Sequence, residues 1–105
     1  MVLSYKMKLV RDKIPDIIKK NGQKPICHIA NDEEYKEALL KKLDEEVKEF
    51  QHDKTAMEIG DMMDILDAIS DVFNFSKEDI EKERVKKNQE RGSFSKRIIL
   101  DKIEK

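Results

Sequence analysis

Hydrophobic residues between positions 31 and 91 recur at the three- and four-residue spacing of helices that bury one face. Side chains that favour the first position of a helix precede each of these stretches, and a glycine follows the last one. The predicted helices run from Asn31 or Asp32 to about Gln51, from Thr55 to about Phe73, and from Ser76 to Arg91 and Gly92. The pattern therefore predicts a mainly helical protein whose first two long helices form a hairpin.

The segments that flank these helices are shorter and less regular. Asp12 is a candidate cap for a short helix with Pro15 in its first turn and Asn21 and Gly22 at its end. Two short apolar runs with β-branched residues, 25–30 and 97–100, are candidates for a small β ribbon, in which Cys27 would be a buried thiol. The expected fold is all-α, a helical hairpin forming a four-helix-type bundle, with a small β ribbon from the terminal segments.

Length and charge narrow the classes of protein that this chain can be. Its 105 residues, 38% hydrophobic and 43% charged, suit one domain spanning residues 1–105. A formal net charge of -1 provides no bulk basic field, so no nucleic-acid polymer is expected as a partner. One cysteine precludes an intrachain disulfide, and a run of about 18 apolar residues is lacking. We therefore expect a soluble, cytoplasmic protein without a membrane partner.

The first long helix carries an acidic residue in the middle of its apolar face. At 100° per residue, its hydrophobic side chains fill an arc of about 140° around Leu39. Glu46 falls about 20° from Leu39, Glu49 lies just beyond the edge of the arc, and Glu45 points well away from it. An acid among apolar residues must be paired, protonated or bound to a cation, so Glu46 is a candidate for chemistry.

The next helix carries two groups of acids. Glu58 and Asp61 lie within its broad apolar face, whereas three others lie opposite and are expected to be solvated: Asp64, Asp67 and Asp71. Thr55 and Glu58 also have the spacing of a capping box, in which the Glu58 side chain would bond to the Thr55 amide and need no metal. That alternative stays open on the sequence alone.

A hairpin would place Glu49 level with Glu58, and Glu46 level with Asp61. Four carboxylates on a seam without interleaved Lys or Arg repel one another unless a multivalent cation lies among them. Oxygen ligands favour Mg²⁺, with Mn²⁺ as the alternative, and leave positions open for phosphate and water. We therefore predict these four acids as metal ligands. Pairing with a neighbouring lysine or a partner chain is the alternative for Glu46.

These acids also resemble a family motif. Glu45-Glu46-Val47-Lys48-Glu49 and Glu58-Ile59-Gly60-Asp61 look like the EExxE…ExxD motif of the all-α nucleoside triphosphate pyrophosphohydrolases, which include MazG-like proteins. The stretches 8–15 and 91–94 resemble its phosphoribosyl-ATP pyrophosphohydrolase-like branch, so the likeness covers nearly the whole chain. The interval of eight residues between Glu49 and Glu58 is shorter than is usual in the family.

The resemblance implies a helical bundle, commonly completed by dimerisation, whose acids hold Mg²⁺ while water attacks a nucleotide and pyrophosphate leaves. It matches Glu46, Glu49, Glu58 and Asp61 to metal ligands. It assigns catalysis to Glu46 and to Glu45, the latter orienting water or a second metal. The expected enzyme is a Mg²⁺-dependent nucleotide pyrophosphohydrolase, with phosphoribosyl-ATP pyrophosphohydrolase as the alternative.

Substrate and partner contacts follow from charge and apolar surface. A triphosphate needs cations beyond the metal. The basic residues expected to contact phosphate are Lys8, Arg11, Lys13, Arg91, Lys96 and Arg97. A short chain with so much apolar helix surface is expected to self-associate as a homodimer or tetramer.

Two other classes of function remain open on the sequence alone. The Glu-x-x-His spacing of Glu49 and His52 suggests a di-iron or di-manganese carboxylate bundle, although no second such pair occurs. A non-catalytic helical interaction module would instead use the acids to meet basic residues of a partner. Metal-dependent stabilisation separates this third class from the enzyme.

Overall fold

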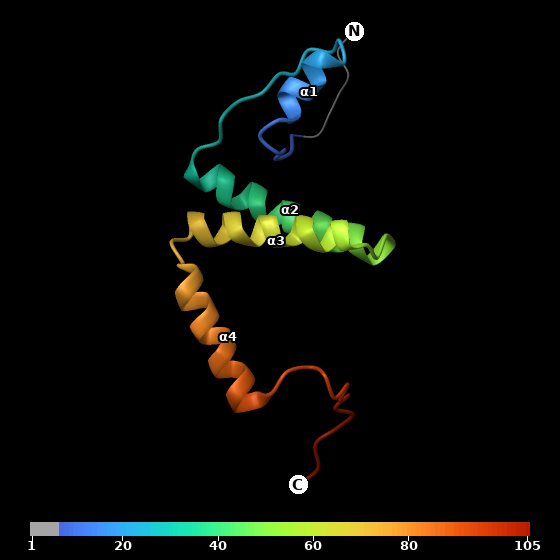
Figure 1. Cartoon of the computed structure of the whole chain (residues 1–105), viewed down its shortest axis with the longest axis vertical. Helices are drawn as coiled ribbons and strands as arrows, with labels where there is room; N and C mark the ends of the chain where they lie inside the picture. Colours follow the sequence, from blue (N-terminus) through green and yellow to red (C-terminus); the bar gives the residue numbers. More distant parts are fainter. Residues whose placement is uncertain (1–6) are drawn as a thin grey trace. The chain divides into compact units, whose positions relative to one another are not determined.

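The computed structural model describes residues 7–105, and every regular element in that range is a helix. The four helices are α1 (Ile14–Lys20), α2 (Asp32–His52), α3 (Ala56–Val72) and α4 (Lys77–Arg91) (Figure 1). The chain divides into two units, the first ending at Asn74 and the second comprising Phe75–Lys105. The all-α fold class predicted from the hydrophobic pattern is confirmed.

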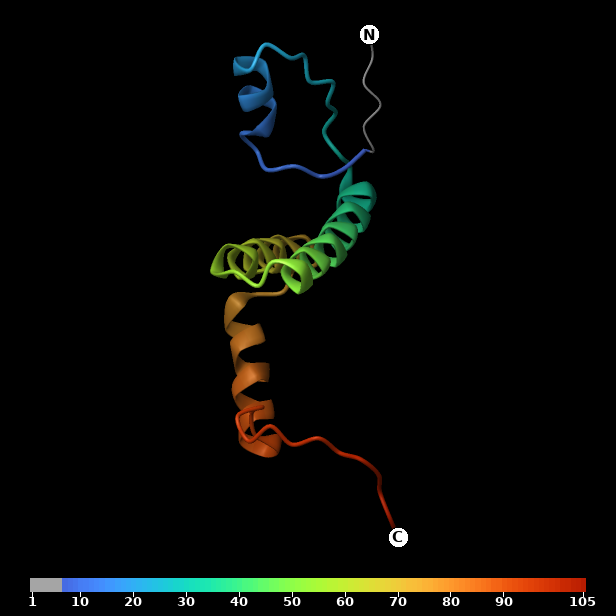
Figure 2. The same cartoon turned by 90° about the vertical axis from the view of Figure 1, so that its right-hand side faces the viewer.

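Helices α2 and α3 pack against each other as a hairpin, which Figure 2 shows from its loop end. The connection is tight: the Asp53 amide donates to the Glu49 carbonyl at 2.8 Å, and the Thr55 amide donates to the Asp53 carbonyl at 2.9 Å. Because the loop is so short, residues near the end of α2 lie opposite residues near the start of α3. The hairpin is the part of the fold that positions the predicted acids.

The core of the hairpin is small. Leu39 of α2 is 2% exposed and Ile65 of α3 is 9% exposed. The remaining inward residues are only half-buried, and they are Tyr35, Leu43, Phe50, Met62, Ala68, Ile69 and Val72. All of them belong to the faces predicted from the helical spacing. Six other residues predicted on those faces are exposed: Leu40, Val47, Met57, Ile59, Leu66 and Phe73. The interior faces are therefore narrower than predicted.

Three of the four helices begin where the sequence predicts, because a polar side chain accepts a bond from an early amide. The acceptors are Asn31, Thr55 and Ser76, which accept from the amides of Glu34 at 2.9 Å, Glu58 at 3.3 Å and Asp79 at 3.0 Å. The last helix ends before Gly92, whose φ of +81° suits a residue without a side chain.

The predicted cap of α1 is wrong. Lys13, and not Asp12, occupies the capping position, and it makes no side-chain capping bond. The helix begins instead from a backbone turn in which the Ile14 amide donates to the Arg11 carbonyl at 3.1 Å. Pro15 lies in the first turn as expected, where its missing N–H is no loss.

The predicted β ribbon is also wrong, because residues 25–30 and 97–100 form no strand. Both segments are irregular and mostly exposed, and the Cys27 thiol expected to be buried is exposed. The segments belong to different units. A two-stranded ribbon is only marginally stable in water without a layer to pack on.

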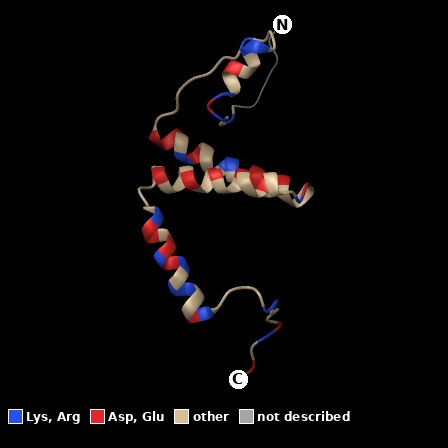
Figure 3. Cartoon of the chain, viewed as in Figure 1, with Lys and Arg blue, Asp and Glu red and all other residues tan. Residues whose placement is uncertain are grey.

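The second unit, Phe75–Lys105, contains one helix and an irregular tail. Acidic and basic residues alternate along α4, whereas α3 carries acids and no Lys or Arg (Figure 3). Within residues 7–105, no helix has the length and apolar character needed to cross a bilayer. Charge, and not apolar surface, therefore dominates α4.

Truncating the most buried side chain tests the hairpin core. Leu39→Ala removes the best-packed residue, so we expect it to lower the free energy of unfolding by about 2–5 kcal/mol in chemical denaturation. The control Ile26→Ala alters an exposed residue and should stay within about 0.5 kcal/mol. Equal losses for the two variants would contradict this description of the core.

Candidate metal centre

Three of the predicted acids come together between α2 and α3. One carboxylate oxygen each from Glu46, Glu58 and Asp61 lies within 4.8 Å of the other two. Glu46 comes from α2, and the other two residues come from the first turns of α3. We call these three residues the acid cluster.

The position of the acid cluster follows from local helix geometry. Glu46 lies in the middle of the inward face of α2, and its side chain is 12% exposed. The Thr55 hydroxyl accepts from the Glu58 amide and fixes the first turn of α3. Asp61, one turn further along, is on the same face as Glu58. Two amphipathic faces and one cap are therefore enough to bring the acids together.

The capping-box alternative for Glu58 is not realised. The Thr55 amide, which the Glu58 carboxylate would have to accept from, donates to the Asp53 carbonyl instead. Only the half of the motif that uses the Thr55 side chain is present. The Glu58 carboxylate is therefore available to the acid cluster.

Glu58 is the most constrained member of the acid cluster. The residue is 7% exposed, and no basic side chain of residues 7–105 forms an ion pair with it. Its pKa is raised first by burial, then by its hydrogen bond with Glu46, and further by the charges of Glu46, Asp61 and Glu49. In the absence of a cation, the ionised form of Glu58 is therefore disfavoured.

Glu46 has a basic neighbour, as one alternative predicted. The Lys42 ammonium lies 3.7 Å from a Glu46 oxygen and also 3.7 Å from a Glu45 oxygen. These long i,i+4 and i,i+3 contacts are shared between two acids, so each contributes little. Lys42 lies beside the acid cluster without neutralising Glu58.

Asp61 is held from the other side by the segment that precedes α1. The Arg11 Nη2 donates to Asp61 Oδ1 at 2.8 Å and lies 2.9 Å from Asp64 Oδ2. The pKa of Arg11 is raised above its ordinary value by its hydrogen bonds to Asp64 and then Asp61. A permanent positive charge therefore lies next to the acid cluster.

Glu49 and Glu45 lie outside the acid cluster. Glu49 is exposed, although its charge still contributes to the raised pKa of Glu58. Glu49 was expected to meet Glu58 because the two lie at the same level of the hairpin. The position of each acid around α2 decides the contact instead, since Glu46 faces inward and Glu49 does not. The Glu45 side chain is half-exposed and points away from the core face, as its position on the helix predicts.

The basic residues expected to contact phosphate fall into two groups. Arg11 lies at the acid cluster, whereas Lys8 and Lys13 are exposed in the same unit and belong to no ion pair among residues 7–105. The other three belong to the second unit and are exposed: Arg91, Lys96 and Arg97. Only Arg11 is brought to the acids by the first unit.

Sequence reasoning missed the role of Asp64. Asp64 is exposed, as its predicted place on the solvated face of α3 requires, but it also binds Arg11 together with Asp61. The three-residue spacing of the two aspartates indicates that they can share a ligand on one side of a helix. No local signal identifies Arg11, which is distant in the sequence, as the partner of Asp64.

His52 does not join the acid cluster. Its side chain is exposed, and its Nδ1 lies 3.4 Å from Asp53 Oδ1 in the loop. The Glu-x-x-His spacing therefore supplies no additional ligand to the three acids, and the di-iron hypothesis gains no support from this geometry.

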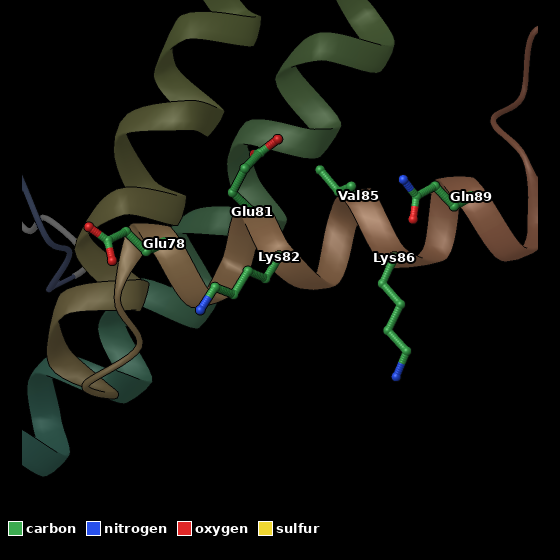
Figure 4. Close-up of a pocket in the computed structure, with 6 residues that line it drawn as sticks. All are labelled: Glu78, Glu81, Lys82, Val85, Lys86 and Gln89. Atoms are coloured by element: carbon green, nitrogen blue, oxygen red, sulfur yellow. The ribbon is translucent and has the colours of Figure 1, made fainter.

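Two hollows in the second unit are lined by residues of that unit alone. One, of about 550 Å³, is a furrow along a single helix, α4 (Figure 4). Its lining residues, which point to different sides of the helix, are Glu78, Glu81, Lys82, Val85, Lys86 and Gln89. The second, of about 280 Å³, lies in the segment 93–99 and includes Lys96 and Arg97. Neither hollow contains a member of the acid cluster.

The acid cluster has the donor chemistry of a site for a hard divalent cation. All three donors are carboxylates, and Mg²⁺ and Mn²⁺ prefer oxygen. Two oxygens on one Mg²⁺ are at most about 4.2 Å apart, twice the bond length of about 2.1 Å. The separations in the cluster, up to 4.8 Å, need only a small contraction to reach that value. The residues present therefore fit Mg²⁺.

Comparison with known proteins leaves the activity unassigned. No model of a known protein family matches the chain, and no solved structure matches it. A protein of Mycolicibacterium smegmatis, described only as uncharacterized, is 49% identical over 43 residues. The matched stretch is 41% of this chain and 44% of that relative. The chain thus spans less than half the length of the relative it matches.

The raised pKa of Glu58 makes stability depend on pH in a defined direction. Between its ordinary pKa and its raised one, Glu58 binds more proton in the folded state than in the unfolded state. The protonated Glu58 stabilises the folded protein fully below about pH 4.3, the ordinary pKa of a glutamate, and this stabilisation is lost as pH rises through the raised pKa. In EDTA, Glu58→Gln should therefore raise the Tm at about pH 8 and change it little near pH 4.

The control for this prediction is Asp67→Asn, which neutralises an exposed acid on the same helix. Its Tm should differ little from wild type at both pH values. A Glu58→Gln protein that melts below wild type at about pH 8 would show that the ionised carboxylate is stabilised by the fold, contrary to the geometry described.

Proposed function

We propose that the α2–α3 hairpin is the metal centre of a Mg²⁺-dependent nucleotide pyrophosphohydrolase. The observation that carries the proposal is the meeting of three carboxylates on facing helices, one of them buried and without a basic partner in residues 7–105. A buried acid of this kind needs a proton or a cation, and a cation fits the donor set. The type of reaction is inferred from the resemblance of the acids to the EExxE…ExxD motif.

The chain's own residues take distinct parts in this proposal. Glu46, Glu58 and Asp61 hold the cation, and Glu49, which lies outside the acid cluster, contributes negative charge that acts on Glu58. When bound, Mg²⁺ would lower the pKa of water and neutralise charge on the leaving pyrophosphate. Half-exposed Glu45, whose contact with Lys42 is long at 3.7 Å, orients water from solvent. The substrate is a nucleoside triphosphate, with phosphoribosyl-ATP as the alternative.

Metal binding and hydrolysis test this proposal together. A cation that binds only the folded protein adds about 2.7 kcal/mol of stability at one hundred times its Kd. We expect Mg²⁺ or Mn²⁺ to raise the Tm of wild type and to have little effect on Glu58→Gln. A panel of nucleoside triphosphates and phosphoribosyl-ATP, incubated with protein and Mg²⁺, should yield pyrophosphate in wild type and at least a hundredfold less in Glu58→Gln.

The matched control is again Asp67→Asn, which should keep both the metal-dependent Tm shift and the hydrolysis. If no nucleotide in the panel yields pyrophosphate and no cation raises the Tm, the enzyme proposal fails. The helical interaction module then becomes the better description of the acids.

We also propose that a second copy of this chain covers the outward side of the hairpin. Exposed apolar residues of α3 and of its C-cap follow the 4,3 spacing of a helix–helix seam: Ile59, Met63, Leu66 and the C-cap residue Phe73. Leu40 and Val47, which lie seven residues apart on α2, are also exposed apolar residues at this spacing. With Leu39 and Ile65 the only buried hydrophobic residues in the range described, the hairpin needs further burial, and a self-complementary seam provides it.

Disrupting the seam tests self-association. Light scattering should give wild type a mass of at least twice 12.4 kDa, and Leu66→Lys should shift it toward the single-chain mass. Val85→Lys is the control, since Val85 has similar exposure on α4, outside the seam. A wild-type protein that is monomeric at micromolar concentration would refute the seam.

A further inference from the structure

We infer that Arg11 is a built-in counter-ion of the acid cluster, one that a divalent cation displaces toward Asp64. The inference rests on the proposed metal centre and adds to it a means of controlling when the cation binds. In this arrangement Arg11 opposes cation binding, and Asp64 provides the place to which its guanidinium withdraws.

The contacts of Arg11 suit such an exchange. A single nitrogen, Nη2, lies 2.8 Å from Asp61 Oδ1 and 2.9 Å from Asp64 Oδ2, so the guanidinium is shared almost equally between the two carboxylates. Asp61 belongs to the acid cluster, whereas Asp64 does not. A small rotation of the side chain would therefore release Asp61 while keeping a charged partner for Arg11.

The anchoring of Arg11 limits the movement to its side chain. Its carbonyl accepts from the Ile14 amide in the turn that begins α1, which ties the backbone to a helix end. The side chain is 59% exposed, and so the guanidinium has room to move. The residue can thus change partner without any rearrangement of α3.

A ligand for the acid cluster is indicated by Glu58, independently of Arg11. Glu58 is 7% exposed as a residue, its carboxylate is hydrogen-bonded to another acid, Glu46, and no basic side chain in the described part of the chain pairs with it. Arg11 reaches only Asp61, and Lys42 reaches only Glu46. The two basic side chains therefore leave the most buried carboxylate without a countercharge, which a divalent cation would supply.

Electrostatics then gives Arg11 an effect opposite to that of a structural support. A positive charge a few ångströms from a bound cation repels it, so loss of Arg11 should tighten cation binding. Loss of a residue that merely holds Asp61 in place would weaken binding. The sign of the change therefore separates the two roles.

The experiment measures Mn²⁺ binding to the full chain from the electron paramagnetic resonance signal of free Mn²⁺. Arg11→Met should lower the Kd by about three- to tenfold relative to wild type, the effect of removing one nearby positive charge. Arg11→Lys should restore a Kd close to wild type, because one nitrogen makes both contacts in wild type. Lys19→Met, which removes an exposed charge from α1, should leave the Kd unchanged.

A double-mutant cycle tests the role of Asp64. Asp64→Asn should raise the Kd by about threefold or more, because Arg11 loses its alternative partner and stays on Asp61. In the Arg11→Met background, Asp64→Asn should change the Kd no more than the control substitution Asp67→Asn does. Circular dichroism of each variant checks that the helices are intact, and little change is expected for an exposed ion pair.

The possible results distinguish a failure of the counter-ion role of Arg11 from a failure of the proposed metal centre. If wild type binds Mn²⁺ and Glu58→Gln does not, the metal centre stands, and an unchanged or weakened affinity in Arg11→Met overturns the counter-ion role alone. Additive effects of Arg11→Met and Asp64→Asn also overturn it. If wild type binds no Mn²⁺, the metal centre itself fails, and the counter-ion role fails with it.

Discussion

The burial of the Glu58 carboxylate against two other acids is the constraint on which the hairpin depends. Burial removes hydration from a charge, and Glu46 and Asp61 add repulsion. The tight Asp53–Thr55 connection and the Thr55 cap nevertheless hold Glu58 in that place. The fold therefore keeps an energetically unfavourable group where a divalent cation would make it favourable, as preorganised sites do.

The two basic residues beside the acid cluster each contact a different acid of the cluster, and neither contacts Glu58. Lys42 approaches from the same helix as Glu46, and Arg11 approaches from a distant segment to reach Asp61. Both contacts are made at the edge, so neither basic side chain neutralises Glu58. This distribution suits a site that takes up and releases its cation, since a fully neutralised cluster would have little affinity for one.

Local features of the sequence were sufficient for most of the fold. The starts of α2, α3 and α4 depend on one side chain each, and the centres of the inward faces depend on helical spacing, so both could be predicted. Glu46, Glu58 and Asp61 were identified for the same reason. Long-range contacts could not be found in this way: Arg11 meets Asp64 across the chain, and the ribbon between 25–30 and 97–100 does not form.

The acid cluster also has a consequence for how the chain folds. All three carboxylates come from the single stretch between Glu46 and Asp61, so only a short loop must close to assemble them. Such local contacts form early, before segments distant in sequence have met. The acids therefore repel one another from the first step of folding. The concentration of ions in solution then affects the rate at which the hairpin forms as well as the stability of the folded protein.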